Sequence, residues 1–276
     1  MASVWAVHDQ ASGRHLALKR LSNAASAAHV ALFEREFHIL ASLHHPCIVE
    51  AHDYGKDADG RFYTMELLEG SDVLPRAPMA WTEACRILRD VASALTPLHA
   101  RRVIHRDLSA RNVGLAPDGR VKLVDFGTMV TFGKPSEIAG TPPFIAPETL
   151  RGQDLDQRTD LYSLGALGHF LLTGRHAFPA RSLAELESIW KQRPHPVGKR
   201  VSELGRDDLP EVPAALESLL DALLSRDPLA RPTTAADVID RPTVVAGLEP
   251  DQHGLVDSYL GQPGVRRTRA GAARAA

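Results

Sequence analysis

The hydrophobic pattern of this 276-residue chain changes near residue 70, and that change limits the folds it can adopt more than any other feature. Before residue 70, short apolar runs separated by polar turns predict two pairs of strands, and one stretch at 27–43 has an apolar face at helical spacing. After residue 70, most apolar residues recur at helical spacing. The pattern predicts an α+β architecture with a small strand-rich lobe, a linker and a larger helical lobe. The four strand-like runs are 3–7, 16–21, 48–54 and 61–67.

Helices are expected over most of the second part. The stretch 81–101 has apolar residues at helical spacing, with Thr82 as a candidate N-cap. Two short apolar runs, 103–104 and 121–124, then flank a loop rich in ionisable residues. Ligands commonly bind in the cleft between two such lobes, so the cleft is the expected site. Later helices are expected at 159–172, 182–190, 213–224 and 234–239.

The charge balance and cysteine content exclude several classes of protein. Lys and Arg number 32 against 34 Asp and Glu, a net charge of −2, so no nucleic-acid or membrane partner is expected. No apolar run approaches the roughly 20 residues of a membrane-spanning helix, and the N-terminus has no secretory signal pattern. Cys47 and Cys85 cannot form a four-ligand zinc site by themselves, and reduced thiols are favoured over a disulfide. A cytoplasmic protein is therefore expected.

Three oxygen-bearing side chains lie in and after the ionisable loop. Asp107 and Asn112 share the segment His105–Asn112, and Asp125 follows it after a hairpin. Carboxylate and amide oxygens suit Mg²⁺, a hard cation, and a further carboxylate can orient an attacking hydroxyl. Each piece alone is a weak signal, but together they fit a site for phosphoryl transfer.

Combined with other motifs in the same order, this segment resembles the eukaryotic-like protein kinase family, in its bacterial serine/threonine form. The resemblance extends from residue 4 to about residue 240. It implies a bilobal kinase domain over 1–245, with a small lobe 1–65, a hinge 66–70 and a large lobe 71–245. Residues 246–276, which contain several arginines, are expected to form a disordered tail. The matching motifs are Ala17-Leu18-Lys19, Glu36, His105–Asn112, Asp125-Phe126-Gly127, Ala146-Pro147-Glu148, Asp160–Gly165 and Arg231.

The resemblance implies a role for each charged residue of the site. Lys19 would hold the α- and β-phosphates of ATP, and Glu36 would pair with Lys19. Asp107 would accept or orient the proton of the acceptor hydroxyl, while Asn112 and Asp125 would bind Mg²⁺, or Mn²⁺ in its place. A lone lysine or glutamate is usually a surface charge, so these roles depend on the match.

The nucleotide base has its own expected contacts. Met65 would lie at the back of the adenine pocket, and the backbone of Glu66 and Leu68 would bond to the adenine edge. Val4 and Ala17 are further expected nucleotide-binding residues. A methionine on a strand is ordinarily a core residue, and both interpretations can hold at once.

Other matches have structural or regulatory roles. Leu40, His105 and Phe126 resemble a packed stack that aligns the two lobes, and Glu148 and Arg231 resemble a buried ion pair. Glu34 is an alternative to Glu36 whose offset fits less well.

The stretch 125–148 resembles an activation segment, and Arg106 resembles an arginine that can meet a phosphate on it. Thr141 resembles the structural threonine beside the substrate site. Ser136 lies nearest the usual position of phosphorylation. The candidate acceptors are Thr128, Thr131, Ser136 and Thr141.

Some positions depart from the family pattern. Val4 stands where the family has the valine that follows its glycine-rich loop, so Ala2 replaces the last glycine and the earlier glycines are missing. Either the chain is truncated, which we favour, or it lacks this loop. Ser109 replaces the usual lysine and Arg111 resembles tyrosine kinases, whereas Gly140-Thr141-Pro142 favours serine/threonine specificity. Gly114 stands where a leucine normally packs beneath adenine.

The main hypothesis is a serine/threonine kinase that transfers the γ-phosphate of MgATP to a protein hydroxyl, with autophosphorylation of the activation segment as a further expectation. A pseudokinase-like binding module is the alternative, because of Ser109, Gly114 and the missing loop. A third hypothesis, a small-molecule kinase of the aminoglycoside type, fits Arg106 and the Ala146-Pro147-Glu148 motif less well. The sequence leaves the acceptor protein and the oligomeric state open.

Overall fold

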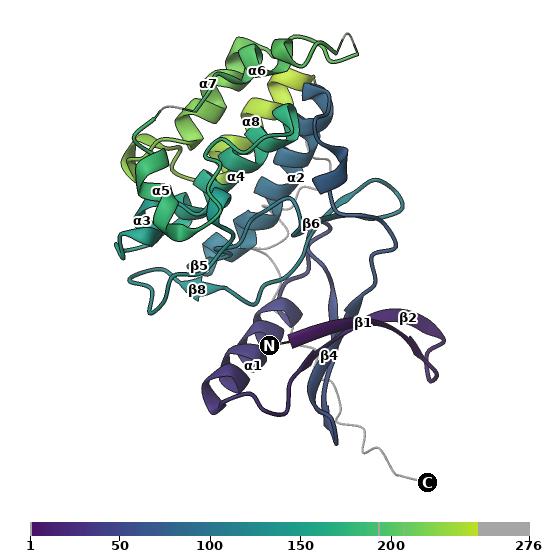
Figure 1. Cartoon of the computed structure of the whole chain (residues 1–276). Coiled ribbons are helices and arrows are strands. Elements are labelled where there is room, and N and C mark those ends of the chain that lie inside the picture. The colour runs from purple at the N-terminus through teal and green to yellow at the C-terminus, as the bar shows by residue number, and fades with distance from the viewer. Residues whose placement is uncertain (1, 193, 207, 248–276) are drawn as a thin grey trace.

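The computed structural model describes residues 2–192, 194–206 and 208–247 and has two lobes (Figure 1). The small lobe contains helix α1 (Ala27–Ala41) and an antiparallel sheet with strand order β1-β2-β4-β3. The large lobe is mainly helical, so the predicted α+β architecture with two lobes is confirmed. The strands of the sheet are β1 (Ala2–Asp9), β2 (Arg14–Leu21), β3 (Ala51–Asp57) and β4 (Gly60–Glu66).

Local sequence explains the first hairpin and the helix that follows it. Gly13 adopts a φ of 70°, which glycine allows at low cost, and its N–H donates to the Asp9 carbonyl to close the β1–β2 turn. Helix α1 begins after Ser26, whose hydroxyl accepts a hydrogen bond from the His29 N–H. Phe33, Glu36 and Leu40 are its buried residues, so one helical face packs inward and carries Glu36 with it.

The third strand begins later than the apolar run 48–54 predicts. Residues 47–49 bond instead to β7 (Val121–Leu123) of the large lobe: the Val49 N–H donates to the Leu123 carbonyl, and the Leu123 N–H donates to the Cys47 carbonyl. This short parallel contact ties the lobes together. The apolar run therefore contains an inter-lobe contact as well as a strand.

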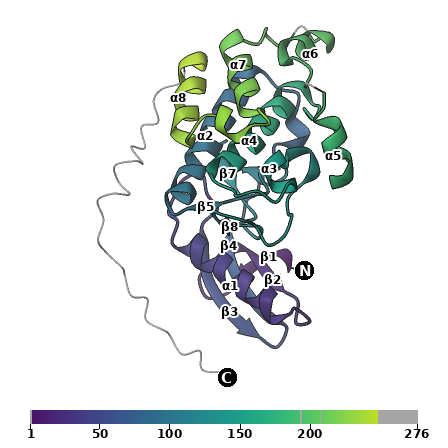
Figure 2. The same cartoon turned by 90° about the vertical axis from the view of Figure 1, so that its left-hand side faces the viewer.

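The large lobe is organised around α4 (Gln157–Thr173), which is buried along almost its whole length. It packs against α2 (Trp81–Ala100) and α7 (Ala214–Leu223) (Figure 2). Two glycines permit this approach. A Cβ on Gly165 would lie 2.6 Å from the Leu223 Cβ, and a Cβ on Gly168 would lie 2.6 Å from Leu220 Cδ2.

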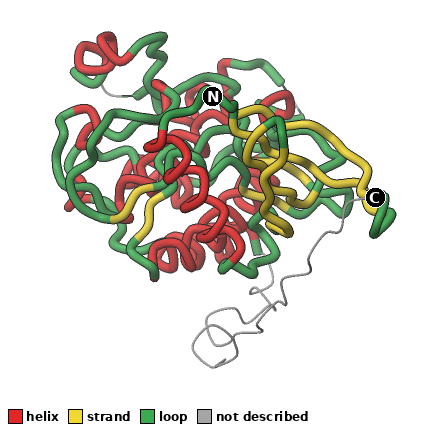
Figure 3. Tube along the Cα trace, turned by 90° about the horizontal axis from the view of Figure 1, so that it is seen from below, coloured by secondary structure: helices red, strands yellow, loops and turns green. Residues whose placement is uncertain are grey.

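Short elements complete the large lobe, and the four-stranded sheet lies to one side of most of the helices (Figure 3). Two predictions for this region were incomplete: α6 was not expected, and α8 continues past residue 239. The other elements are η1 (Leu74–Arg76), β5 (Val103–Ile104), β6 (Val113–Leu115), β8 (Val130–Thr131), η2 (Pro142–Phe144), α3 (Pro147–Leu150), α5 (Leu183–Ile189), α6 (Val197–Glu203), η3 (Pro228–Ala230) and α8 (Ala235–Ala246).

Four further sequence expectations concern a helix cap, the cysteines, membrane-spanning helices and the tail. Thr82 is not the N-cap of α2: the helix begins at Trp81, and Ala80 precedes it without a side-chain cap. Cys47 and Cys85 are both buried and are not joined to each other. Across the described ranges, no helix combines the length and apolarity needed to cross a membrane. The expected tail 246–276 lies outside the described residues except for its first two.

Candidate active site

An ammonium and two carboxylates from three separate elements meet between the lobes. Lys19 on β2 places its Nζ 2.7 Å from Glu36 Oε1 on α1 and 3.0 Å from Asp125 Oδ1, which follows β7. The Tyr63 hydroxyl donates to the same Glu36 oxygen at 3.0 Å. The Glu36 side chain is only 5% exposed, whereas that of Asp125 is 55% exposed. Glu36 therefore anchors the lysine from within, and Asp125 faces the opening. Glu34 takes no part, because it pairs with Arg61.

The electrostatics of the Lys19–Asp125 contact favour the charged form of both side chains. Burial alone would raise the pKa of Asp125, but the Lys19 ammonium and the hydrogen bonds outweigh burial and lower it. Burial would likewise lower the pKa of Lys19, and the two carboxylates raise it instead. Asp125 has a left-handed backbone, with φ of 56°, and the Gly127 N–H lies 3.4 Å from its Oδ1. The turn therefore aims a charged carboxylate into the cleft.

A third carboxylate, Asp107, is held by three donors from two loops. Its Oδ1 accepts from the Thr141 N–H at 2.8 Å and from the Thr141 hydroxyl at 2.7 Å. Its Oδ2 accepts from Asn112 Nδ2 at 2.9 Å. The Val124 N–H donates to the Asn112 carbonyl at 3.0 Å, which brings this loop beside Asp125. Five of the predicted residues thus lie on neighbouring segments of the fold: Lys19, Glu36, Asp107, Asn112 and Asp125.

Asp160 supports the loop His105–Asn112 by binding its backbone, a role that was not predicted from the sequence. Its two oxygens accept from the His105 and Arg106 N–H groups, each at 2.9 Å, and His99 Nε2 lies 2.9 Å from Oδ2. Burial alone would raise the pKa of Asp160, but these partners, His99 first, lower it. Arg106 has φ of 71°, a strained value for a non-glycine residue that these bonds hold in place. Two features of the sequence indicated that Asp160 has a special role: it is an acidic residue in the first turn of an otherwise apolar helix, and it begins the matching motif Asp160–Gly165.

The expected packing contacts are also present. The rings of His105 and Phe126 meet edge to face with centroids 4.9 Å apart, and Leu40 is buried with them in the core. Arg231 and Glu148 form a bidentate pair, with N–O distances of 2.6 and 2.8 Å. The first contact joins the loop His105–Asn112 to the segment after β7, and the second joins α3 to the chain that follows η3 within the large lobe.

A cavity of about 360 Å³ lies beside the charged group, a size suited to a small ligand. Its lining is largely apolar and comes from both lobes. Asp107, Asn112 and Glu36 are not among the lining residues. The sequence-predicted residues that line it are Val4, Ala17, Lys19, Met65, Glu66, Leu68 and Asp125.

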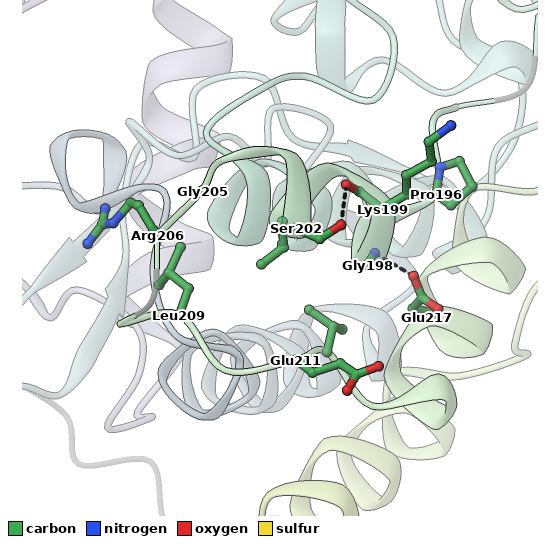
Figure 4. A pocket seen from close by; sticks show the side chains of 11 residues that line it. Pro196, Gly198, Lys199, Ser202, Gly205, Arg206, Leu209, Glu211 and Glu217 are labelled. Atoms are coloured by element: carbon green, nitrogen blue, oxygen red, sulfur yellow. Dashed lines mark hydrogen bonds between the residues drawn. The ribbon is translucent and has the colours of Figure 1, made fainter.

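A larger hollow of about 730 Å³ lies by α6 in the large lobe (Figure 4). Lys199, Arg206 and Glu211 on its border are exposed to solvent. Glu217 accepts a hydrogen bond from the Gly198 N–H, so this carboxylate is used within the protein. No group of converging charges like that around Lys19 occurs there among the described residues, and the inter-lobe cavity is the stronger candidate.

The segment 125–148 is bound to the loop His105–Asn112 through hydroxyl groups. Thr128 Oγ1 donates to the His105 carbonyl at 2.9 Å, as Thr141 donates to Asp107. Arg106, expected near a phosphate, donates through Nη2 to the Glu137 carbonyl at 2.7 Å, next to Ser136. Two of the candidate acceptor hydroxyls are therefore engaged in holding the fold.

A family model for the protein kinase domain matches residues 1–243. The chain belongs to the protein kinase family. Members of the family use ATP with a divalent metal ion and act on protein substrates.

Three curated relatives show how far the similarity of this kinase extends. It is 29% identical to serine/threonine-protein kinase PrkC of Bacillus subtilis over 86% of this chain and 37% of PrkC. It is 30% identical to serine/threonine-protein kinase pkn2 of Myxococcus xanthus over 96% of this chain and 33% of pkn2. Identity to serine/threonine-protein kinase PknF of Mycobacterium tuberculosis is 36%, over 74% of this chain and 47% of PknF. The chain thus spans a third to a half of the length of these relatives.

Proposed function

We propose that this kinase is a serine/threonine kinase that transfers the γ-phosphate of MgATP to a hydroxyl group of a protein. The observation that carries the proposal is the meeting of two charged clusters at one cleft. Lys19 contacts Asp125 at 3.0 Å, and Asp107 accepts from Asn112 at 2.9 Å on the adjoining loop. Positioning and electrostatic stabilisation are what phosphoryl transfer chiefly requires of a protein.

Each charged residue has a separate role in the proposed phosphoryl transfer. Lys19, fixed by Glu36, neutralises charge on the α- and β-phosphates. Asp107 orients the acceptor hydroxyl and takes its proton as the hydroxyl oxygen bonds to the γ-phosphorus. The bond from that phosphorus to the bridging oxygen breaks, and its electron pair leaves with ADP.

Asn112 and Asp125 are suited to hold the divalent ion. Asp125 Oδ1 contacts Lys19, whereas its Oδ2 has no polar partner among the described residues and the side chain is 55% exposed. An amide and a carboxylate oxygen form the hard donor set that Mg²⁺ prefers, and Mn²⁺ accepts the same ligands. When bound, the metal ion would neutralise phosphate charge.

Serine/threonine specificity is supported by Thr141. Its hydroxyl and N–H both bind Asp107, so this threonine forms part of the surface where the acceptor hydroxyl must lie. Curated relatives named serine/threonine-protein kinases point the same way. We place the protein in the cytoplasm on its sequence composition, and we expect its partner to be the acceptor protein.

The test is transfer of label from γ-³²P-ATP, with Mg²⁺, to the kinase itself and to casein, followed by phosphoamino-acid analysis. We expect labelled phosphoserine or phosphothreonine only when Mg²⁺ is present. Binding of MgATP without transfer would support a pseudokinase instead. Transfer to small alcohols alone would support a small-molecule kinase.

A further inference from the structure

The floor of the inter-lobe cavity is formed in an unexpected way. Gly114, on β6, stands where the family resemblance implies a leucine beneath the base. A Cβ placed on Gly114 would lie only 2.6 Å from Leu68 Cδ1. The Leu68 side chain therefore already occupies the space into which a side chain at position 114 would extend. Leu68 lines the cavity, and Gly114 does not.

The chain that follows Leu68 is fixed against β6. A Cβ on Gly70 would lie 2.1 Å from the Leu115 carbonyl oxygen, so only glycine permits this approach. The Leu115 N–H donates to the Ser71 carbonyl at 3.3 Å, and the Val73 N–H donates to the Val113 carbonyl at 3.0 Å. These contacts on both sides of Gly114 hold Leu68 above it.

The part of the cavity formed by the small-lobe sheet is apolar as well. Val4 and Ala17 line it from β1 and β2, which pair with each other along the hairpin. A flat heteroaromatic ring between Leu68 and these two residues would have apolar groups against both faces. This arrangement removes the faces of the ring from water while leaving its edge for hydrogen bonds.

We propose that Leu68, rather than a residue of β6, is the apolar floor on which the purine of the bound nucleotide rests. Gly114 is the position that makes room for it. The proposal rests on the proposed function, because it assumes that the cleft binds ATP. Position 114 then determines nucleotide affinity through the space it leaves and not through a contact of its own.

The two positions should compensate for each other. Leu68→Ala removes the floor and should weaken MgATP binding by about tenfold, on the scale of one lost apolar side chain. Gly114→Leu should push Leu68 into the cavity and weaken binding at least as much. The double variant moves the leucine from the hinge to β6, and its affinity should return to within about threefold of the unmodified kinase.

The experiment measures MgATP and MgADP dissociation constants by calorimetry for these variants, together with their unfolding free energies. Leu229→Ala, at an exposed site away from the cavity, is the matched control and should bind normally. If Gly114→Leu fails to fold, Gly114→Ala replaces it, alone and with Leu68→Ala. Even without nucleotide, the stability lost at position 114 should be partly regained when Leu68 is shortened.

Two results overturn the inference. One is unchanged affinity of Leu68→Ala, and the other is a double variant that binds no better than its position-114 parent. Both leave the proposed function intact, since the unmodified kinase still binds MgATP. Failure of the unmodified kinase to bind MgATP would overturn the proposed function, and the floor assignment with it.

Discussion

Two groups of ion pairs in this kinase differ in how far their side chains are exposed to solvent. In the large lobe, the Arg231 and Glu148 side chains are 0% and 2% exposed, and every contact they make is internal. Arg231 also donates to the carbonyls of Ser225 and Arg158, and Thr159 donates to Glu148. In the cleft, Lys19 serves two carboxylates, one of them open to solvent.

The comparison separates charges that hold the fold from charges that can act on a ligand. A buried pair whose hydrogen bonds are all made within the protein cannot exchange partners without a large energetic cost. The Lys19–Asp125 contact can be exchanged for contacts with a ligand at lower cost, because Asp125 already faces water. Degree of exposure, more than residue type, therefore distinguishes the two groups.

The largest effect is expected for Asp125→Asn, which should lower the rate of transfer but leave the unfolding free energy nearly unchanged. The rate of transfer should fall at least about a hundredfold, since one preorganised group that acts on the developing charge is lost. Because Asp125 is half exposed, the unfolding free energy should change by less than about 1 kcal/mol. Steady-state transfer assays and urea unfolding measure the two quantities. A stability loss as large as that of a buried pair would contradict the distinction.

Arg231→Met should give the reverse result. It leaves the buried Glu148 carboxylate unpaired and should lower the unfolding free energy by about 3–5 kcal/mol. Thermal and urea unfolding measure this loss. The control is Arg231→Met combined with Glu148→Leu, which removes both charges and should recover much of the stability. No recovery in the double variant would show that charge pairing is not the cause.

Asp160 is a buried carboxylate whose contribution to the unfolding free energy should depend on pH. Its pKa is lowered in the folded state, so its contribution to stability is present above its unfolded pKa of about 3.9 and is lost as pH falls through the lower folded value. Asp160→Asn should cost about 2–3 kcal/mol at pH 7, because charged hydrogen bonds to backbone N–H groups are weakened. The difference from the unmodified kinase should shrink below pH 4 in urea unfolding. A difference that stays constant with pH would assign the loss to packing.

Lys122 and Glu66 provide an intermediate case and the smallest effect. Their contact of 2.8 Å joins β7 to the end of β4, with side chains 12% and 29% exposed. Lys122→Ala should lower the unfolding free energy by no more than about 1 kcal/mol. Urea unfolding at low and high salt measures it, and the loss should be smaller at high salt. A loss near that of Arg231→Met would mean that partial exposure does not weaken such pairs.

Much of the fold and site could be predicted from sequence. The change of periodicity near residue 70 predicts the two lobes from local patterns, and the resemblance to the protein kinase family implies which residues meet, including the Lys19–Glu36 contact. Helix α6 was missed because it is only seven residues long, with Val197 and Val201 as its buried residues. Such a short apolar pattern is not distinguishable from a loop.

The features that were missed depend on distant parts of the chain. Residues 47–49 form hydrogen bonds with β7, so β3 begins later than the apolar run predicts. Leu68 fills the space above Gly114 only because Gly70 lets the hinge approach β6. From the sequence alone, Gly114 shows only that the leucine of the family pattern is absent. Its compensation is a property of packing between segments more than 40 residues apart.

The most direct test of the account is the transfer rate of Asp107→Asn, measured on protein shown to be folded and to bind MgATP. The asparagine keeps the size of the side chain and an oxygen for the Thr141 donors, but it cannot take a proton. The account predicts unchanged MgATP affinity and a transfer rate lower by about 10²–10⁴-fold. A variant that transfers phosphate at the unmodified rate would contradict the role assigned to Asp107.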